Sequence, residues 1–341
     1  MHFLYFQMLT VGKGIALLRW SRRGGMMDSI SNSIRLGFIG VGNMGSRIAR
    51  RLLDHGYTVI VFDTDHQKAE ALERHGAEVA TSIAHLARMS EVVLSCLTND
   101  EAVRNVYLGA DGILSNARLC PLVLEMSTIS PSTSREVSRY GQERGVNVLD
   151  IAISGSTPAA EQGTLTLLAG GNIEIFNVVE PILRVIAGQY FYLGPSGSGT
   201  SMKLVVNTLL GVGMQSVAEA VALGQKAGLD RHRLLDVLAK TAVIPPALAG
   251  KLGRVSEEDY SPQFPLRLMN KDFRLILETA AELRVPMPAT AAAFQINSAE
   301  LGSACGKDFS IVIELMEALA KIRPFGEETQ TGTSTSSERV Q

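Results

Sequence analysis

The chain has 341 residues, of which 46% are hydrophobic and 19% charged, and its formal net charge is −2. This length allows two domains that each have a core. The composition is typical of a globular protein rather than a disordered one. The small net charge is unlike the strongly basic character of nucleic-acid-binding domains, so we expect no nucleic-acid partner.

The spacing of the cysteines and histidines limits the metal and redox chemistry that we expect. Cys96, Cys120 and Cys305 lie far apart, and neither a CxxC pattern nor an HExxH pattern occurs. We therefore expect no metal site and no disulfide framework, but free thiols in a reducing cytoplasm. No continuous apolar run reaches the roughly 20 residues that span a bilayer, so we expect no membrane association.

The N-terminal segment differs from the rest of the chain. Its first 27 residues contain four lysines and arginines and no acidic residue. This pattern fits a targeting segment, or an upstream start codon with the working protein beginning at Met26 or Met27. Because no small-residue cleavage site follows an apolar stretch, we favour the second interpretation. We expect residues 1–33 to be an unstructured or mis-started extension.

Residues 34–196 alternate short apolar runs with amphipathic stretches. The predicted strands are 36–40, 58–62, 91–97, 122–126, 148–153, 165–169 and 190–193, and the first two predicted helices are 43–55 and 65–74. Nearly continuous apolar strands separated by helices are typical of a parallel sheet that is covered on both faces. Right-handed crossovers then give a doubly wound, Rossmann-type α/β domain.

The pattern changes after residue 196. A long helix is predicted over 198–227, without proline and apolar around most of its circumference, so we expect it to be buried. Further helices are predicted at 231–240, 266–284, 288–302 and 308–321. We therefore predict an all-helical second domain over 197–324. The Ser/Thr-rich tail, 325–341, is expected to be disordered.

A glycine motif lies between the first predicted strand and the first predicted helix, which is the context that makes such a motif specific. It consists of Gly40, Val41, Gly42, Asn43, Met44 and Gly45. The first glycine permits a tight turn, the second lets the backbone approach a pyrophosphate, and the third lets the helix pack against the strand. The N–H groups at the helix N-terminus then face the phosphates. The motif predicts a dinucleotide site.

Asp63 ends the second predicted strand, 18 residues after Gly45. A carboxylate at this place accepts the ribose hydroxyls of NAD and repels the 2′-phosphate of NADP. Residues 64–67 contain no arginine that could bind such a phosphate. NAD is therefore the favoured cofactor, with NADP as the alternative.

Four stretches, in this order, resemble the β-hydroxyacid dehydrogenase family, whose best-known member is 3-hydroxyisobutyrate dehydrogenase. They are 36–45 (LGFIGVGNMG), 150–171 (DIAISGS and GTLTLLAGG), 197–207 (GSGTSMKLVVN) and 268–272 (LMNKD). The resemblance covers about residues 36–320. It implies reversible NAD(P)-dependent oxidation of a short 3-hydroxy acid to its semialdehyde, by a homodimer or homotetramer.

The resemblance also implies roles for particular residues. Lys203 corresponds to the catalytic lysine and Asn207 to its partner asparagine, while Ser154, Gly155 and Ser156 correspond to the loop that binds the substrate carboxylate. As chemistry, Lys203 is the general acid of reduction and the general base of oxidation, with a pKa lowered by burial. Asn207, four residues further along the helix, shares its face and holds the substrate oxygen. The alternative is a lysine that reaches solvent without a role.

Further residues are implied at the cofactor. Thr128 corresponds to the threonine after the fourth strand, and Lys271 to the lysine of the Lys-Asp pair, with Asp272 orienting local hydrogen bonds. Leu97 and Thr98 stand where the family usually has Leu-Pro at the cofactor edge. Two structural alternatives stay open: a helix N-cap around Thr128 and a surface ion pair at residues 271–272.

Departures from the family pattern leave the substrate open. Ser156 replaces the usual third glycine of the substrate loop, and Ala159 replaces a glycine further on. A Ser-Gly-Ser loop is similar to that of the glyoxylate and succinic semialdehyde reductase branch. That branch usually prefers NADP, however, against which Asp63 argues.

Other relatives fit less well. The helical domain is too short for a 6-phosphogluconate dehydrogenase, and imine reductases lack the lysine that stands here as Lys203. A non-catalytic cofactor-binding protein is the alternative from another class, and the intact Lys203 and Asn207 argue against it.

Overall fold

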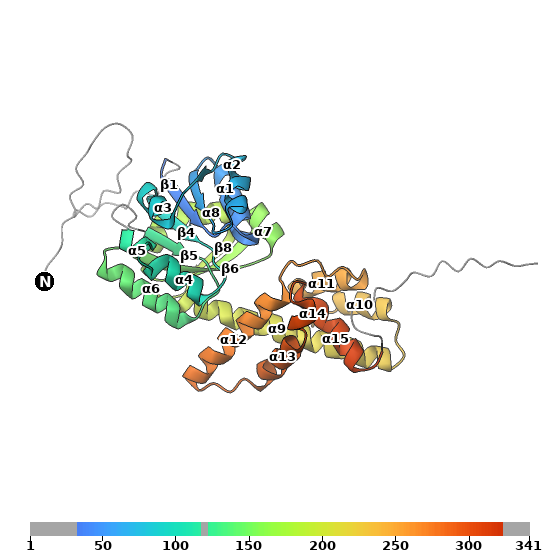
Figure 1. Ribbon diagram of the computed structural model, residues 1–341. Coiled ribbons are helices and arrows are strands. Elements are labelled where there is room, and N and C mark those ends of the chain that lie inside the picture. Colours follow the sequence, from blue (N-terminus) through green and yellow to red (C-terminus); the bar gives the residue numbers. More distant parts are fainter. Residues whose placement is uncertain (1–32, 117–121, 323–341) are drawn as a thin grey trace, which may run out of the picture. The chain divides into compact units, whose positions relative to one another are not determined.

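The computed structural model describes residues 33–116 and 122–322. The predictions for the extension before residue 33, for the tail 325–341 and for Cys120 lie outside these residues. The chain divides into two compact units between Val205 and Val206. Each unit has its own architecture (Figure 1).

The first unit is built on an eight-stranded sheet. Its strands are β1 Arg35–Ile39, β2 Thr58–Phe62, β3 Glu78–Val79, β4 Val92–Ser95, β5 Leu122–Glu125, β6 Asn147–Ser154, β7 Leu165–Gly170 and β8 Ala187–Tyr192. The strand order is β3-β2-β1-β4-β5-β6-β7-β8. The doubly wound sheet predicted from the apolar runs is confirmed, and the two-residue β3 is added to it.

One strand pair departs from the expected parallel arrangement, because β6 and β7 run antiparallel. Only the six-residue helix α7 Thr157–Gln162 joins these two strands. Such a helix rises about 9 Å, which is too short for a crossover along the sheet. The chain therefore returns into the sheet at the edge where β6 ends.

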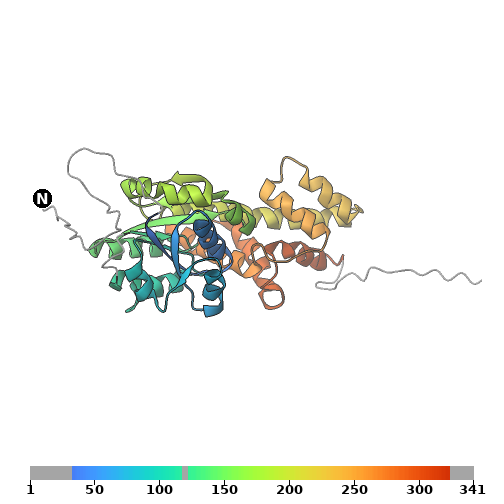
Figure 2. The same ribbon diagram turned by 90° about the horizontal axis from the view of Figure 1, so that it is seen from above.

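Helices cover both faces of the sheet (Figures 1 and 2). They are α1 Asn43–Asp54, α2 His66–Glu73, α3 Ile83–Met89, α4 Asp100–Leu108, α5 Ile113–Asn116, α6 Pro131–Glu143, α7 and α8 Ile173–Ile186. Apolar side chains of α1, α2, α7 and α8 pack on one face of the sheet. Those of α3, α4, α5 and α6 pack on the other face. The central strands β1, β4, β5 and β6 are thus buried on both sides, which explains their mainly apolar character, whereas the edge strands β3 and β8 are partly exposed.

The second unit is helical, as predicted. Its helices are α10 Arg231–Ala239, α11 Pro246–Ser256, α12 Leu266–Leu283, α13 Pro288–Ala299, α14 Leu301–Ala304, the 3-10 turn η1 Phe309–Ile311 and α15 Val312–Leu319. The long helix α9 Ser198–Lys226 runs through the division between the units. Helix α11 is absent from the sequence-based prediction.

The expectation that α9 is buried around its circumference is wrong for the single chain. Val205, Leu209 and Leu223 are 54%, 73% and 73% exposed. In the described part of the chain, α9 is also the one helix long and apolar enough to cross a membrane by length and composition. A core helix of a globular domain passes the same test, so this finding assigns no membrane to the protein.

Candidate functional site

The predicted residues of the first unit follow neighbouring parallel strands. The glycine loop follows β1, Asp63 follows β2, residues 97–98 follow β4, Thr128 follows β5, and residues 154–156 lie at the end of β6. Because these strands are parallel, their carboxyl ends share one edge of the sheet. The connection changes direction between β1 and β4, and doubly wound sheets bind ligands in such a crevice.

The glycine loop has the geometry that a dinucleotide needs. Gly40 has φ +85°, and a Cβ there would lie 2.3 Å from the Cys96 carbonyl oxygen. A Cβ on Gly45 would lie 2.0 Å from the Gly40 carbonyl oxygen. A Cβ on Gly42, by contrast, would meet nothing within 4 Å. Packing therefore requires glycine at positions 40 and 45, while Gly42 borders open space that suits a pyrophosphate.

The start of α1 favours an anion beside this loop. Gly42 is the N-cap residue and provides no side-chain cap, and the first turn contains no acidic residue. Asn43 is exposed and Met44 half-buried. The N–H groups of the first turn and the positive end of the helix dipole thus fit the phosphates of the expected cofactor.

Asp63 is attached to the glycine loop. Its Oδ2 accepts a hydrogen bond from the Val41 N–H at 2.9 Å, and its Oδ1 accepts one from the Asp65 N–H at 2.9 Å. A carboxylate has further lone pairs, so Asp63 retains acceptors for ribose hydroxyls. The sequence indicates Asp63 as a cofactor residue but does not indicate its bond to Val41.

The turns after β4 and β5 are joined to each other. The Leu97 N–H donates to Ser127 Oγ at 2.7 Å. Thr98 is exposed and Thr128 half-buried. The N-cap of α6 is Ser130, whose Oγ accepts from the Thr133 N–H. The capping alternative therefore does not account for Thr128.

The predicted substrate loop begins where β6 ends. Gly155 has φ +146°, and a Cβ there would lie 2.8 Å from Leu165 Cδ2. Ser156 is the N-cap residue of α7, but its side chain makes no capping hydrogen bond. Gly155 and Ser156 are exposed and Ser154 is half-buried. Backbone N–H groups and serine hydroxyls at such a turn suit a carboxylate.

Helix α9 is anchored to β6 by Asp150. This buried carboxylate accepts hydrogen bonds from the Gly197 N–H at 2.9 Å and the Thr200 N–H at 3.0 Å. Burial raises the pKa of Asp150, and the two N–H donors act against that shift. Lys203 follows Thr200 within one turn and is half-buried. The strand that ends at Ser154 therefore also fixes the beginning of the helix that carries Lys203.

The second unit contains Asn207, Lys271 and Asp272. Asn207 is fully buried, and its Nδ2 donates to Asp272 Oδ2 at 2.5 Å. Lys271 Nζ lies 2.9 Å from Asp272 Oδ1, with side chains only 15% and 2% exposed. A surface ion pair is therefore excluded for Lys271 and Asp272. Within the described residues, Asn207 Oδ1 is buried without a hydrogen-bond partner.

Sequence reasoning assigns no role to Asp150 or Glu125, although both lie at this edge of the sheet and are only 2% exposed. The available signal is an acidic residue inside an apolar strand, because a buried carboxyl group requires hydrogen-bond partners.

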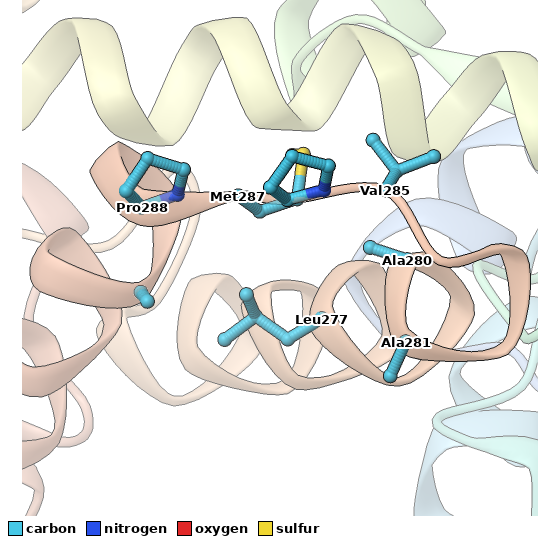
Figure 3. Close-up of a pocket in the computed structure, with 8 residues that line it drawn as sticks. Leu277, Ala280, Ala281, Val285, Met287 and Pro288 are labelled. Carbon is cyan, nitrogen blue, oxygen red and sulfur yellow. The ribbon is translucent and has the colours of Figure 1, made fainter.

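Other parts of the described structure are not candidates. Among the described residues, no group of three His, Cys, Asp or Glu side chains is arranged to hold a metal ion. An apolar pocket lies where α12 connects to α13 (Figure 3). It is lined by Leu277, Ala280, Ala281, Val285, Pro286, Met287, Pro288 and Ala291, so it lacks groups for acid–base chemistry.

Comparison with known proteins matches both parts of the chain. Residues 35–194 match the family model described as the NAD binding domain of 6-phosphogluconate dehydrogenase. Residues 197–319 match the model described as NAD-binding of NADP-dependent 3-hydroxyisobutyrate dehydrogenase.

Individual relatives span nearly the same length. A 2-(hydroxymethyl)glutarate dehydrogenase from Eubacterium barkeri is 33% identical, over 87% of this chain and 99% of its own. Glyoxylate/succinic semialdehyde reductase 1 of Arabidopsis thaliana is 33% identical, over 83% of this chain and 99% of its own. The structure of Mycobacterium tuberculosis 3-hydroxyisobutyrate dehydrogenase with L-serine superposes with a TM-score of 0.76 at 29% identity, covering 83% of this chain and 99% of that one.

Proposed function

The chain belongs to the β-hydroxyacid dehydrogenase family of NAD(P)-dependent enzymes that act on CH–OH groups, and we propose that it interconverts a short 3-hydroxy acid and its semialdehyde. One observation carries this proposal. Strand β6 holds the first turn of α9 through Asp150 and ends at Ser154, where the predicted carboxylate loop begins. The lysine-bearing helix and the substrate loop thus share one rigid support.

The roles of the chain's own residues follow from their chemistry. The loop at residues 154–156 binds the substrate carboxylate through N–H groups and hydroxyls. Lys203 Nζ donates a proton to the carbonyl oxygen during reduction and accepts the hydroxyl proton during oxidation. Asn207 uses its Oδ1 and its second Nδ2 hydrogen to orient the substrate oxygen, while Asp272 fixes the amide. The bound cofactor supplies or accepts the hydride.

The cofactor is a nicotinamide dinucleotide, and we infer that NAD is preferred over NADP. Asp63 supports this preference because it stands beside the glycine loop, where its charge would repel a 2′-phosphate. Residues 64–67 are exposed and contain no arginine.

An activity panel tests the proposed reaction. The substrates are 3-hydroxyisobutyrate, 3-hydroxypropionate, glycerate, L-serine and 2-(hydroxymethyl)glutarate for oxidation, and glyoxylate and succinic semialdehyde for reduction, each with both cofactors. We expect turnover of at least one hydroxy acid with NAD. If none of these compounds is turned over, the proposed substrate class is wrong.

A semialdehyde or glyoxylate reductase is the second candidate. Ser156 supports it, because the Ser-Gly-Ser loop is similar to the loop of that branch, and the Arabidopsis relative carries this activity in its name. A higher kcat/KM for glyoxylate with NADPH than for any hydroxy acid with NAD would favour this candidate.

We further propose a homodimer or homotetramer in the cytoplasm that acts on small molecules, without nucleic-acid or membrane partners. Exposed apolar side chains on α9 support the assembly. Among the described residues, Cys96 and Cys305 form no disulfide bond, which agrees with a reducing compartment. Cell fractionation and light scattering after gel filtration test these two proposals.

A further inference from the structure

A row of buried polar side chains crosses the sheet where three neighbouring strands end. Ser95 on β4 is paired with Glu125 on β5, and Glu125 is paired with Asp150 on β6. Residues at the same register of parallel strands point to the same face of a sheet. The three side chains are at most 2% exposed. An acid at the centre of such a row requires an explanation, because the rest of β5 is apolar.

Glu125 is hydrogen-bonded to the turn that follows its own strand. Its Oε1 accepts from the Ser127 N–H at 2.9 Å and lies 3.5 Å from Ser95 Oγ. Ser127 Oγ in turn accepts the Leu97 N–H at 2.7 Å. Ser95 Oγ is 2.6 Å from the Tyr107 hydroxyl, which extends the network to α4. Glu125 therefore supports the turn after β5 directly and the turn after β4 through Ser127.

These two turns lie on the side of the glycine loop opposite to Asp63. Along the edge of the sheet, the order is Asp63 after β2, the glycine loop after β1, Leu97 after β4 and Thr128 after β5. The adenosine ribose belongs at Asp63 and the pyrophosphate at the glycine loop. The nicotinamide half of a bound cofactor would then extend over the turns that Glu125 supports.

We propose that Glu125 is a positioning residue that, as a neutral acid, holds the turns after β4 and β5 for the nicotinamide half of the cofactor, while its neighbour Asp150 remains charged and holds the start of α9. This inference rests on the proposed dehydrogenase function. It assigns different protonation states to two adjacent carboxyl groups.

The surroundings explain this difference. Asp150 accepts two backbone N–H groups at the positive end of α9, which favours its charged form. Glu125 Oε2 is buried without a hydrogen-bond partner in the described part of the chain. Burial raises the pKa of Glu125 to about 8, the hydrogen bonds from Ser127 act against that rise, and the charge of Asp150 adds to it. Ionised Glu125 would therefore place a second negative charge beside Asp150, with no hydrogen-bond donor for its Oε2 among the described residues.

The other titratable and charged groups near this row do not neutralise Glu125. They are Tyr107 bonded to Ser95, Asp100 bonded to Ser130, Arg104 bonded to Thr133, Arg135 beside Gly197, and Cys96, which packs on the opposite face of the sheet. A rise in pH above about 8 should consequently deprotonate Glu125, and repulsion between its carboxylate and that of Asp150 should then displace Glu125 and loosen both turns.

The test is the dissociation constant of NADH, measured by fluorescence titration without substrate between about pH 6.5 and 9.5. For the wild type we expect a constant value up to about pH 8 and then a rise that approaches about tenfold per pH unit, because binding must restore the proton. Glu125→Gln cannot ionise, so its dissociation constant should stay flat. Glu143→Gln, at an exposed position on α6, is the matched control and should follow the wild type.

Ser127→Ala provides a second readout if Glu125→Gln does not fold. This variant loses the bond to Leu97 but keeps Glu125, so its dissociation constant for NADH should be about tenfold higher at every pH, with the alkaline rise retained. A flat wild-type profile, an alkaline rise in Glu125→Gln, or unchanged binding by Ser127→Ala would overturn the inference. Absence of NADH binding by the wild type at any pH would instead overturn the proposed function.

Discussion

At the scale of single residues, Asp63 and Lys203 carry separate parts of the proposed function. Asp63 lies beside the glycine loop and is the residue that we propose to set the preference for NAD over NADP. Lys203 lies in the second turn of α9 and is the residue that we propose to transfer the proton. Because the two roles are separate, a change at one residue should leave the other property intact. Binding and turnover can therefore be measured independently.

Lys203→Ala should reduce kcat by about 10²- to 10⁴-fold, which is the contribution typical of a positioned general acid or base. The dissociation constant of NADH should change by less than about threefold, since less than 1 kcal/mol is at stake. Lys226→Ala, at the exposed end of the same helix, is the matched control and should turn over like the wild type. Near-normal turnover by Lys203→Ala would mean that the lysine merely reaches solvent.

Asp63→Asn should shift the ratio of kcat/KM for NADP to that for NAD upward by at least about tenfold, or ~1.4 kcal/mol. The amide oxygen still accepts the Val41 N–H, so the glycine loop keeps its support while the negative charge is removed. Asp65→Asn removes a nearby exposed charge and should leave the ratio unchanged. An unchanged ratio in Asp63→Asn would argue against Asp63 as the residue that discriminates the ribose.

At the scale of elements, continuous apolar runs in the sequence predict the strands and helices. Contacts between strands cannot be predicted from such runs. The apolar run at 58–62 predicts β2 with its observed bounds. Helix α11 escapes, because it has no capping side chain and contains Gly250 and Gly253, which are poor helix formers.

The same contrast between local patterns and contacts of distant residues applies to the candidate site. The glycine loop and the Lys203–Asn207 spacing are local motifs, so the sequence reveals them. The bonds from Gly197 to Asp150 and from Leu97 to Ser127 join residues 47 and 30 positions apart. Such bonds depend on the register of the strands, which an apolar run buried on both faces specifies only weakly.

The protonation of Glu125 makes a prediction about the stability of the sheet. Its pKa is raised from 4.5 to about 8 in the folded chain, so the native state holds a proton that the unfolded state loses. Stability should therefore fall as pH rises from about 4.5 to about 8 and become independent of Glu125 above that range. Thermal unfolding midpoints should decrease over this window in the wild type relative to Glu125→Gln. Parallel midpoints for the two proteins would contradict a neutral Glu125, and Glu143→Gln should follow the wild type.

At the scale of the whole molecule, the two compact units meet inside helix α9. The boundary predicted from the sequence, between residues 196 and 197, lies just before this helix, and the division between the compact units falls between Val205 and Val206. The same helix leaves large apolar side chains exposed in the single chain. Isolated apolar residues are ordinary on protein surfaces, but several on one helix that is otherwise part of a core indicate a surface covered in the assembly.

A Leu209→Glu substitution tests that assembly. Leu209 is 73% exposed in the single chain, and burying a leucine contributes about 2 kcal/mol. A symmetric dimer loses this contribution twice, so its dissociation constant should rise roughly a thousandfold. Light scattering after gel filtration should give a dimer or tetramer for the wild type and a monomer for the variant. Arg233→Glu, on the exposed side of α10, should leave the assembly unchanged. A wild-type monomer at micromolar concentration would mean that the exposed face of α9 remains in water.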